Sequence, residues 1–121
     1  MAGNSKNALK PFQMIVSGDM SADITGTPTN IMFMDNVSIE LQFTGTPTGT
    51  FYVDVSNTYD PISNPTPTWI TLPLSPTPVA TGVAGVVGID YNQSGFEWVR
   101  VRYTRTSGSG TLDGYIAVKA V

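Results

Sequence analysis

The sequence predicts an all-β fold: a single β-sandwich of about eight strands, jelly-roll-like, with an immunoglobulin-like sandwich as the alternative. Short apolar runs recur along the chain, and the 12 glycines and 9 prolines fall between them. Thr and Val are abundant, whereas the helix formers Ala, Leu, Glu, Lys and Arg are sparse. Short strands joined by turns produce this pattern. The chain has no cysteine, so the Cys–Trp–Cys pattern of immunoglobulin domains is missing.

The 121 residues fit one domain. The N-terminal residues are small and polar, and we expect residues 1–10 to form a flexible arm and residues 11–121 to form the sandwich. An arm of this kind either frays in solution or becomes ordered on a neighbouring subunit.

The first strands are predicted around the first of two identical segments, "TGTPT" at Thr25–Thr29. Pro11–Gly18 is the first strand candidate, and the short apolar segments "ADI" and Asn30–Met34 lie on either side of TGTPT. We interpret TGTPT as a turn device, because Gly permits positive φ, Pro prevents continued pairing and Thr favours extended backbone.

The clearest strand pattern lies on both sides of the second TGTPT, Thr44–Thr48. Val37–Thr44 and Thr50–Ser56 alternate between apolar and polar residues, which indicates two half-buried strands. Because a short connection rich in Gly and Pro joins them, we expect these two strands to form a hairpin. Their predicted inward-facing residues are Val37, Ile39, Leu41, Phe43, Phe51, Val53 and Val55.

Connections dominate the middle of the chain. Asn57–Thr68 is polar and rich in proline, and it is predicted to be a long loop. Trp69–Leu74 is a short strand that Pro73 interrupts, which favours a position at a sheet edge. The next segments are predicted to be a connection at Ser75–Gly85, a strand at Val86–Asp90 and a turn at Tyr91–Gly95.

Phe96–Thr106 is the strongest strand candidate in the chain. Strict alternation places Trp98 on the face opposite Val99, Val101 and Tyr103. We therefore expect either a bulge near Trp98 or a strand with both faces covered.

The chain ends in a turn and a strand. Ser107–Gly110 is predicted to be a flexible turn that leads into the strand Thr111–Val121, and we expect the last two strands to form a hairpin. Alternation puts Leu112, Ile116 and Val118 on one face of this last strand, and Tyr115 and Lys119 on the other.

The net charge of −3 disfavours a nonspecific binder of nucleic acid or of a membrane surface. The chain contains no run of about 18 apolar residues, and its N-terminus lacks the apolar core of a signal peptide. We therefore expect a protein made in the cytoplasm that binds neither nucleic acid nor membrane.

The absence of cysteine and histidine excludes several kinds of active site. Zinc sites built from Cys and His are excluded, as are Cys nucleophiles and His general bases. Asp54 and Asp60 flank the long loop and could share a metal ion, but the acids do not follow the spacing of a calcium loop. We predict no enzyme, metal or cofactor, and keep an enzyme acting through two carboxylates as an alternative.

Arg100 and Arg102 are candidate partner-binding residues, because spacing of two puts both guanidinium groups on one face of the strong strand. They either bind the carboxylates of a partner protein or an acidic glycan, or they pair with Glu40, Glu97 or Asp113 on adjacent strands.

Two aromatic residues and two lysines complete the candidate site. Trp69 and Tyr59, with Asp60, border the long loop and form either a sugar-stacking platform or part of the core or an interface. Lys6 and Lys10 belong to the predicted arm, where they are candidate contacts to a partner.

Three segments resemble small all-β virion proteins of bacteriophages. The first is "GTFYVDVS" followed by "TWITLPLSPTPVA", the second is "IDYNQSGFEWVRVRYTR", and the third is the final "YTRTSGSGTLDGYIAVK". Together they cover about residues 35–121. The loop "NTYDPISNPTPTW" is longer than its counterpart in such proteins, which suggests a loop special to this chain.

The resemblance implies a non-enzymatic particle component: a capsid decoration protein, a head-fibre or spike anchor, or a tail-associated protein. The expected partners are major capsid or tail proteins and further copies of the chain, with a homotrimer favoured, and the expected location is the virion. The alternative is a carbohydrate-binding adhesin module of a phage tail or fibre, with a host surface glycan as its ligand.

Overall fold

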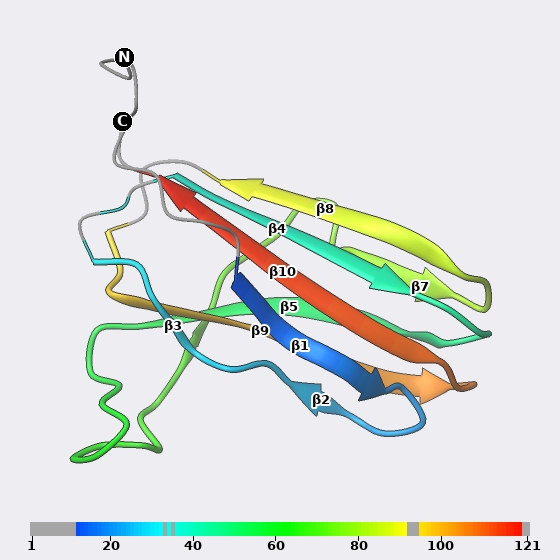
Figure 1. The fold of residues 1–121 in the computed structure, drawn as a ribbon, viewed down its shortest axis with the longest axis horizontal. Helices are drawn as coiled ribbons and strands as arrows, with labels where there is room; N and C mark the ends of the chain where they lie inside the picture. Colours follow the sequence, from blue (N-terminus) through cyan, green and yellow to red (C-terminus); the bar gives the residue numbers. More distant parts are fainter. Residues whose placement is uncertain (1–11, 33, 35, 92–94, 120–121) are drawn as a thin grey trace.

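The structure is a computed structural model that describes residues 12–32, 34, 36–91 and 95–119, and the side chains of Tyr91 and Lys119 are not described. Its strands form two antiparallel sheets stacked face to face (Figure 1). Sheet A contains β1 (Phe12–Asp19), β10 (Thr111–Lys119), β4 (Asn36–Phe43) and β8 (Gly85–Tyr91), in that order. Sheet B contains β2 (Ile24–Thr25), β3 (Thr29–Asn30), β9 (Trp98–Ser107), β5 (Thr48–Ser56), β6 (Ile70–Thr71) and β7 (Val79–Thr81).

The strand pairs confirm the predicted β-sandwich and follow the jelly-roll scheme. β1 pairs with β10, β2 and β3 with β9, β4 with β8, and β5 with β6 and β7. Early strands thus pair with late ones, as in a long antiparallel hairpin that is folded over into two sheets. The structure has ten strands instead of the predicted eight or so, because two strands of the scheme are each split in two.

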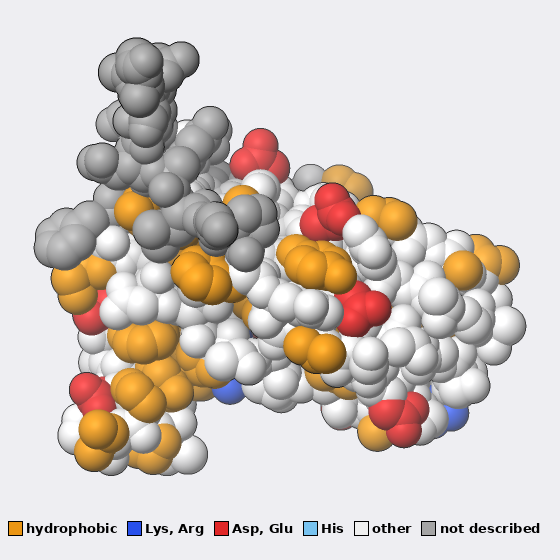
Figure 2. Space-filling model, viewed as in Figure 1, with side chains coloured by type: hydrophobic (Ala, Val, Ile, Leu, Met, Phe, Trp, Pro, Cys, Tyr) orange, Lys and Arg blue, Asp and Glu red, His pale blue; other side chains and the backbone are white. Residues whose placement is uncertain are grey.

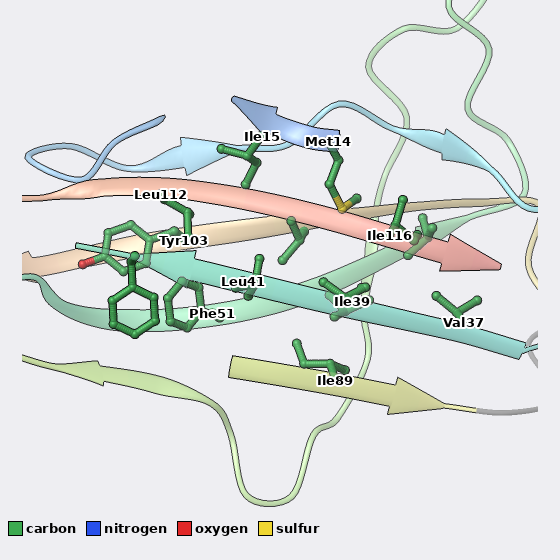
Figure 3. Close-up of a cluster of buried hydrophobic side chains, with 14 of the residues drawn as sticks. Met14, Ile15, Val37, Ile39, Leu41, Phe51, Ile89, Tyr103, Leu112 and Ile116 are labelled. Atoms are coloured by element: carbon green, nitrogen blue, oxygen red, sulfur yellow. The ribbon is translucent and has the colours of Figure 1, made fainter. Parts of the chain in front are cut away.

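The core lies between the two sheets, and alternation predicted its residues correctly. All seven residues expected to face inward from Val37–Thr44 and Thr50–Ser56 are buried. Leu112, Ile116 and Val118 of β10 are buried as well. Figure 3 shows side chains of β1, β4 and β10 meeting those of β5 and β9 in one layer, with Phe51 and Tyr103 toward one end. Their ring centroids lie 5.1 Å apart.

The second TGTPT segment does not close a hairpin, and that prediction is wrong. β4 and β5 belong to different sheets, so Thr44–Thr48 carries the chain across the sandwich. Both strands have one apolar face, and placing them in opposite layers lets these faces bury each other. The pairing partners of the two strands are instead β10 and β9.

The predicted hairpin of the last two strands is also wrong, because Ser107–Gly110 crosses between the sheets beside the second TGTPT. The two crossings bond to each other: Thr46 N–H donates to Ser109 O over 2.8 Å. Gly108 has a φ of 75°, and a Cβ there would lie 2.0 Å from Thr46 O. Glycine is therefore required at this crossing.

The first TGTPT segment interrupts an edge strand. β2 and β3 both pair with β9, and the residues between them bulge out of the ladder. Gly26 N–H donates to Val101 O in sheet B over 2.8 Å, and Thr27 N–H donates to Met14 O in sheet A over 3.0 Å. The segment thereby ties the two sheets together. Of the described residues in the expected apolar strand Asn30–Met34, only Asn30 belongs to a strand, as the last residue of β3.

The middle of the chain supplies the edge of sheet B opposite β2. The strand expected at Trp69–Leu74 is shortened to β6, which ends before Pro73, and the connection expected at Ser75–Gly85 contains the unpredicted strand β7. No helix among the described residues is long and apolar enough to cross a membrane.

Candidate functional site

Four of the six predicted site residues come together on the outer face of sheet B. β9 buries Val99, Val101 and Tyr103, so Trp98, Arg100 and Arg102 project from the opposite face. The register between β5 and β9 is unbroken from Gly49–Arg105 to Ser56–Trp98. The expected bulge near Trp98 is therefore absent there, and the second expectation is correct: both faces of β9 are covered.

Asp54 of β5 holds the two arginines in place. Arg100 Nε and Arg102 Nε donate to its Oδ2 over 3.0 and 2.9 Å, and Arg102 Nη2 lies 3.3 Å from Oδ1. The hydroxyl of Thr71 on β6 donates to Oδ1 over 2.8 Å. The side chain of Asp54 is only 1% exposed, whereas those of Arg100 and Arg102 are 21% and 29% exposed. Asp54 is thus a buried anchor beneath two partly accessible cations.

The pKa of Asp54 reflects this environment. Burial acts to raise it, but hydrogen bonds from Arg102, Thr71 and Arg100 outweigh burial and hold the pKa of Asp54 below its usual value. The hydrogen bond to Asp54 in turn raises the pKa of Arg102. The carboxylate of Asp54 and the guanidinium group of Arg102 therefore remain charged through the neutral range.

Aromatic rings surround the arginines. The Arg100 guanidinium lies 4.3 Å from the centroid of the Trp69 ring, in cation–π geometry. The Tyr59 ring packs 5.4 Å from Trp69 and edge-on at 4.8 Å from Trp98. Arg102 lies over the Tyr52 ring at 4.6 Å. We call this group, Asp54, Tyr59, Trp69, Trp98, Arg100 and Arg102, the sheet B cluster.

The long loop that brings Tyr59 and Trp69 to the cluster has its own hydrogen bonds. The backbones of Asp60 and Asn64 bond to each other in both directions over 3.0 Å. Asp60 Oδ1 accepts from the N–H groups of Ile62 and Ser63 over 2.8 and 2.9 Å, and these bonds lower the pKa of Asp60. The loop therefore presents its aromatic residues from a defined backbone.

The structure does not bring Asp54 and Asp60 together as a metal site. Asp54 is enclosed by arginines, and Asp60 bonds to its own loop. Within the described ranges, no three acidic side chains gather as metal ligands would. The role of Asp54 becomes visible only in the register of β5 and β9, where it lies directly opposite Arg100.

The other predicted site residues lie elsewhere. None of the three acids expected to pair with the arginines does so: Glu40 and Asp113 project from sheet A, and Glu97 precedes β9. Asp54 of β5 pairs with both arginines instead. Lys6 and Lys10 lie outside the described residues. On the face of sheet A shown in Figure 2, acidic side chains are spread among apolar and uncharged ones, and Lys and Arg are visible only at the margin.

A groove of about 330 Å³ lies next to the cluster, along the β5–β6 side of sheet B. Its lining residues are Tyr52, Thr71, Leu72, Pro73, Leu74 and Thr77. Tyr52 and Thr71 also contact Arg102, so the groove and the sheet B cluster form one continuous surface. No protein-family model matches the chain, and a search of curated proteins finds no match to it.

Proposed function

We propose that this protein is a non-enzymatic structural component of a bacteriophage particle, acting as a capsid decoration protein or as an anchor for a fibre or spike. It works through protein–protein contacts with major capsid or tail proteins and with further copies of itself. The sheet B cluster is the observation that most supports a role in protein–protein contacts. Trp, Tyr and Arg are the residue types most enriched at the energetic centres of protein interfaces.

The geometry of the cluster favours binding. Arg100 and Arg102 are already fixed by Asp54, and Arg100 is also fixed by its contact with Trp69. Side chains that are ordered before binding lose less conformational entropy when a partner docks. The guanidinium groups remain partly exposed, so a carboxylate or a backbone carbonyl of the partner can reach their remaining N–H donors.

The assignment to a phage particle depends on the resemblance of residues 35–121 to small all-β virion proteins. The composition agrees with it, because only 12% of residues are charged and eight large apolar side chains are exposed among the described residues. A surface of this kind suits extensive contacts in an assembly.

The test is the presence of the chain in particles. Virions of the phage that encodes it are purified on a density gradient, and the chain is quantified by mass spectrometry against the major capsid protein. We expect a fixed stoichiometric ratio. Absence of the chain from purified particles would overturn the proposal.

A substitution then identifies the contact surface. Trp69→Ala should lower incorporation into particles, because loss of a central aromatic contact typically weakens an interface by about 2 kcal/mol, or roughly thirtyfold. Tyr115→Ala is the matched control, since Tyr115 is also a half-buried aromatic residue but lies on the outer face of sheet A. Circular dichroism confirms that both variants are folded. Equal incorporation of the two variants would assign the contact to another surface.

Carbohydrate binding at the same surface is the second candidate. The groove beside the cluster and the aromatic residues Tyr59 and Trp69 favour it. Two contacts argue against it, because Arg100 covers part of the Trp69 ring and Asp60 is bonded to its own loop. A glycan array with the wild-type protein and Trp69→Ala separates the candidates: only an adhesin shows binding that the substitution abolishes.

A further inference from the structure

The two sheets present four edges, and three of them are interrupted. β1 has two register shifts against β10 and a Ser17 φ of 48°, and Thr27 bonds to part of its free side. The edge formed by β2 and β3 is broken by the first TGTPT. The edge formed by β6 and β7 is broken by a segment that contains three prolines. Bulges, short strands and prolines are the devices that keep sheet edges from pairing with other chains.

β8 is the exception. Its seven residues pair with β4 in unbroken register, from Gly85–Phe43 to Tyr91–Val37. The strand contains no proline and no lysine, and Asp90 is its single charge. Figure 1 shows it at the margin of sheet A with only β4 alongside it in that sheet. In the described part of the chain, no loop donates or accepts a backbone hydrogen bond at β8.

We propose that β8 is an oligomerisation strand. It pairs antiparallel with β8 of a second copy of this chain, about a two-fold axis at Gly88, and the two four-stranded sheets become one continuous sheet. The overlap spans all seven residues of the strand. It forms about six main-chain hydrogen bonds, because an antiparallel ladder exchanges two bonds at every second residue pair.

The side chains of β8 are complementary to themselves in this register. Val87 and the buried Ile89 both lie on the inner face of the sheet. In the dimer, Val87 of each copy would lie opposite Ile89 of the other copy. On the outer face, Val86 would oppose Asp90 of the second copy. On the inner face an apolar residue thus lies opposite an apolar one, and on the outer face no charge lies opposite a like charge.

The two copies of Glu40, one on each side of the axis, are too far apart to repel each other strongly. Glu40 on β4 neighbours Gly88 on the acidic outer face of sheet A. With two β8 strands between them, the two copies of Glu40 stand roughly 14 Å apart, three strand spacings, which is beyond the screening length of about 8 Å at physiological salt. A second copy is therefore a compatible occupant of this edge.

The inference is independent of the particle role proposed above, since it depends only on β8 and its neighbours. It also differs from the trimer favoured above, because a two-fold contact that uses the same strand on both sides closes after two copies. Sedimentation velocity from micromolar to millimolar concentration is therefore expected to show a monomer–dimer equilibrium.

Charge substitutions at Val86 test the register. Val86 is 68% exposed, so its replacement should leave the monomer folded. Val86→Asp places a carboxylate opposite Asp90 of the other copy, so the dimer gains two like-charge pairs. The substitution should weaken dimerisation roughly tenfold or more. Val86→Lys places a cation there and should preserve or tighten the dimer at low salt. Val16→Asp on β1, at a site that is 70% exposed, is the matched control and should have no effect.

A cross-link tests the position of the axis. The chain has no cysteine, and a Cβ at Gly88 would meet nothing within 4 Å. Gly88→Cys should form an intermolecular disulfide on mild oxidation much faster than Val16→Cys, because directly opposed residues bring their Cβ atoms within reach of a disulfide.

Several results would overturn the proposal: a monomer at every concentration, a trimer, a dimer that Val86→Asp leaves intact, equal weakening by Val86→Asp and Val86→Lys, or equal cross-linking rates for the two cysteine variants. A dimer with the opposite response to the two charges and rapid cross-linking at Gly88 would establish it.

Discussion

Asp54 and Arg102 make a two-point contact across neighbouring strands, with Arg102 Nε 2.9 Å from Oδ2 and Nη2 3.3 Å from Oδ1. Asp54 lies directly opposite Arg100 in the ladder, so the contact with Arg102 is diagonal. One buried carboxylate thus holds two arginines that would otherwise repel each other. The order of the sheet B cluster therefore depends on Asp54.

Asp54→Asn should destabilise the fold by about 2 kcal/mol, the typical value of hydrogen bonds to a charged group. The amide keeps the shape of the side chain but offers one acceptor oxygen to two guanidinium groups and Thr71. Urea unfolding measures the change. Asp90→Asn, at an exposed carboxylate, is the control and should stay near the wild type. A loss below about 0.5 kcal/mol would mean that water replaces Asp54 at the partly exposed arginines.

Acid should weaken the fold through the same residue. Although burial acts to raise it, hydrogen bonds hold the pKa of Asp54 below its usual value, so the folded state binds this proton more weakly than the unfolded chain. The contribution of Asp54 is thus fully present above about pH 4 and is lost as the pH falls through the lowered pKa. Urea unfolding of the wild type and Asp54→Asn from pH 7 to low pH should show their difference shrinking in acid. A constant difference would contradict this.

Alternation predicted which residues face the core, but it did not predict which strands pair. Val37, Leu41, Phe51 and Val53 are buried as expected, because period-two burial is a local property of each strand. The connection at Thr44–Thr48 looks alike whether it closes a hairpin or crosses between sheets. Whether β4 and β5 pair with each other depends on strands that are far away in the sequence. β10 lies beside β4 and β9 lies beside β5, so β4 and β5 belong to different sheets.

The candidate site was predicted in its exposed part and missed in its buried part. Arg100, Arg102 and Trp69 are recognisable by residue type and spacing alone. Asp54 is not, because alternation with Val53 and Val55 places it on the outer face, and outer-face acids are usually solvated. It is buried because the two arginines and Thr71 of β6 enclose its carboxylate.

Tyr103→Phe should stabilise the protein by about 1 kcal/mol, since removal of an unsatisfied buried hydroxyl recovers part of its desolvation cost. Tyr103 is fully buried, and its hydroxyl has no hydrogen-bond partner among the described residues. Thermal unfolding measures the gain, with Tyr52→Phe on the outer face as the control. A loss of stability would show that the hydroxyl does have a partner, such as a buried water molecule.

The same hydroxyl predicts the behaviour in alkali. Burial raises the pKa of Tyr103, so the unfolded chain releases this proton more readily than the folded one. The stability associated with neutral Tyr103 is fully present below about pH 10 and is lost as the pH rises through the raised pKa. Tyr103→Phe lacks this hydroxyl, so its stability advantage over the wild type should grow as the pH rises above about 10. Parallel curves for the two proteins would contradict the assignment.

Gly49, next to the second TGTPT, should tolerate no side chain. A Cβ there would lie 2.4 Å from Thr104 O and 2.6 Å from two ring atoms of Tyr103, so β5 and β9 approach closely only because this residue is glycine. Gly49→Ala must push the Tyr103 ring or separate the two strands, and should cost about 3 kcal/mol, the upper range for overpacking a core.

Gly88→Ala is the matched control, because a Cβ at Gly88 meets nothing within 4 Å and alanine restricts the unfolded chain. Urea unfolding at concentrations low enough to keep the chain monomeric should therefore rank Gly88→Ala at or above the wild type and Gly49→Ala well below it. Equal stability of the two variants would mean that the ring of Tyr103 moves aside freely, which its fully buried position between Phe51 and the neighbouring strands opposes.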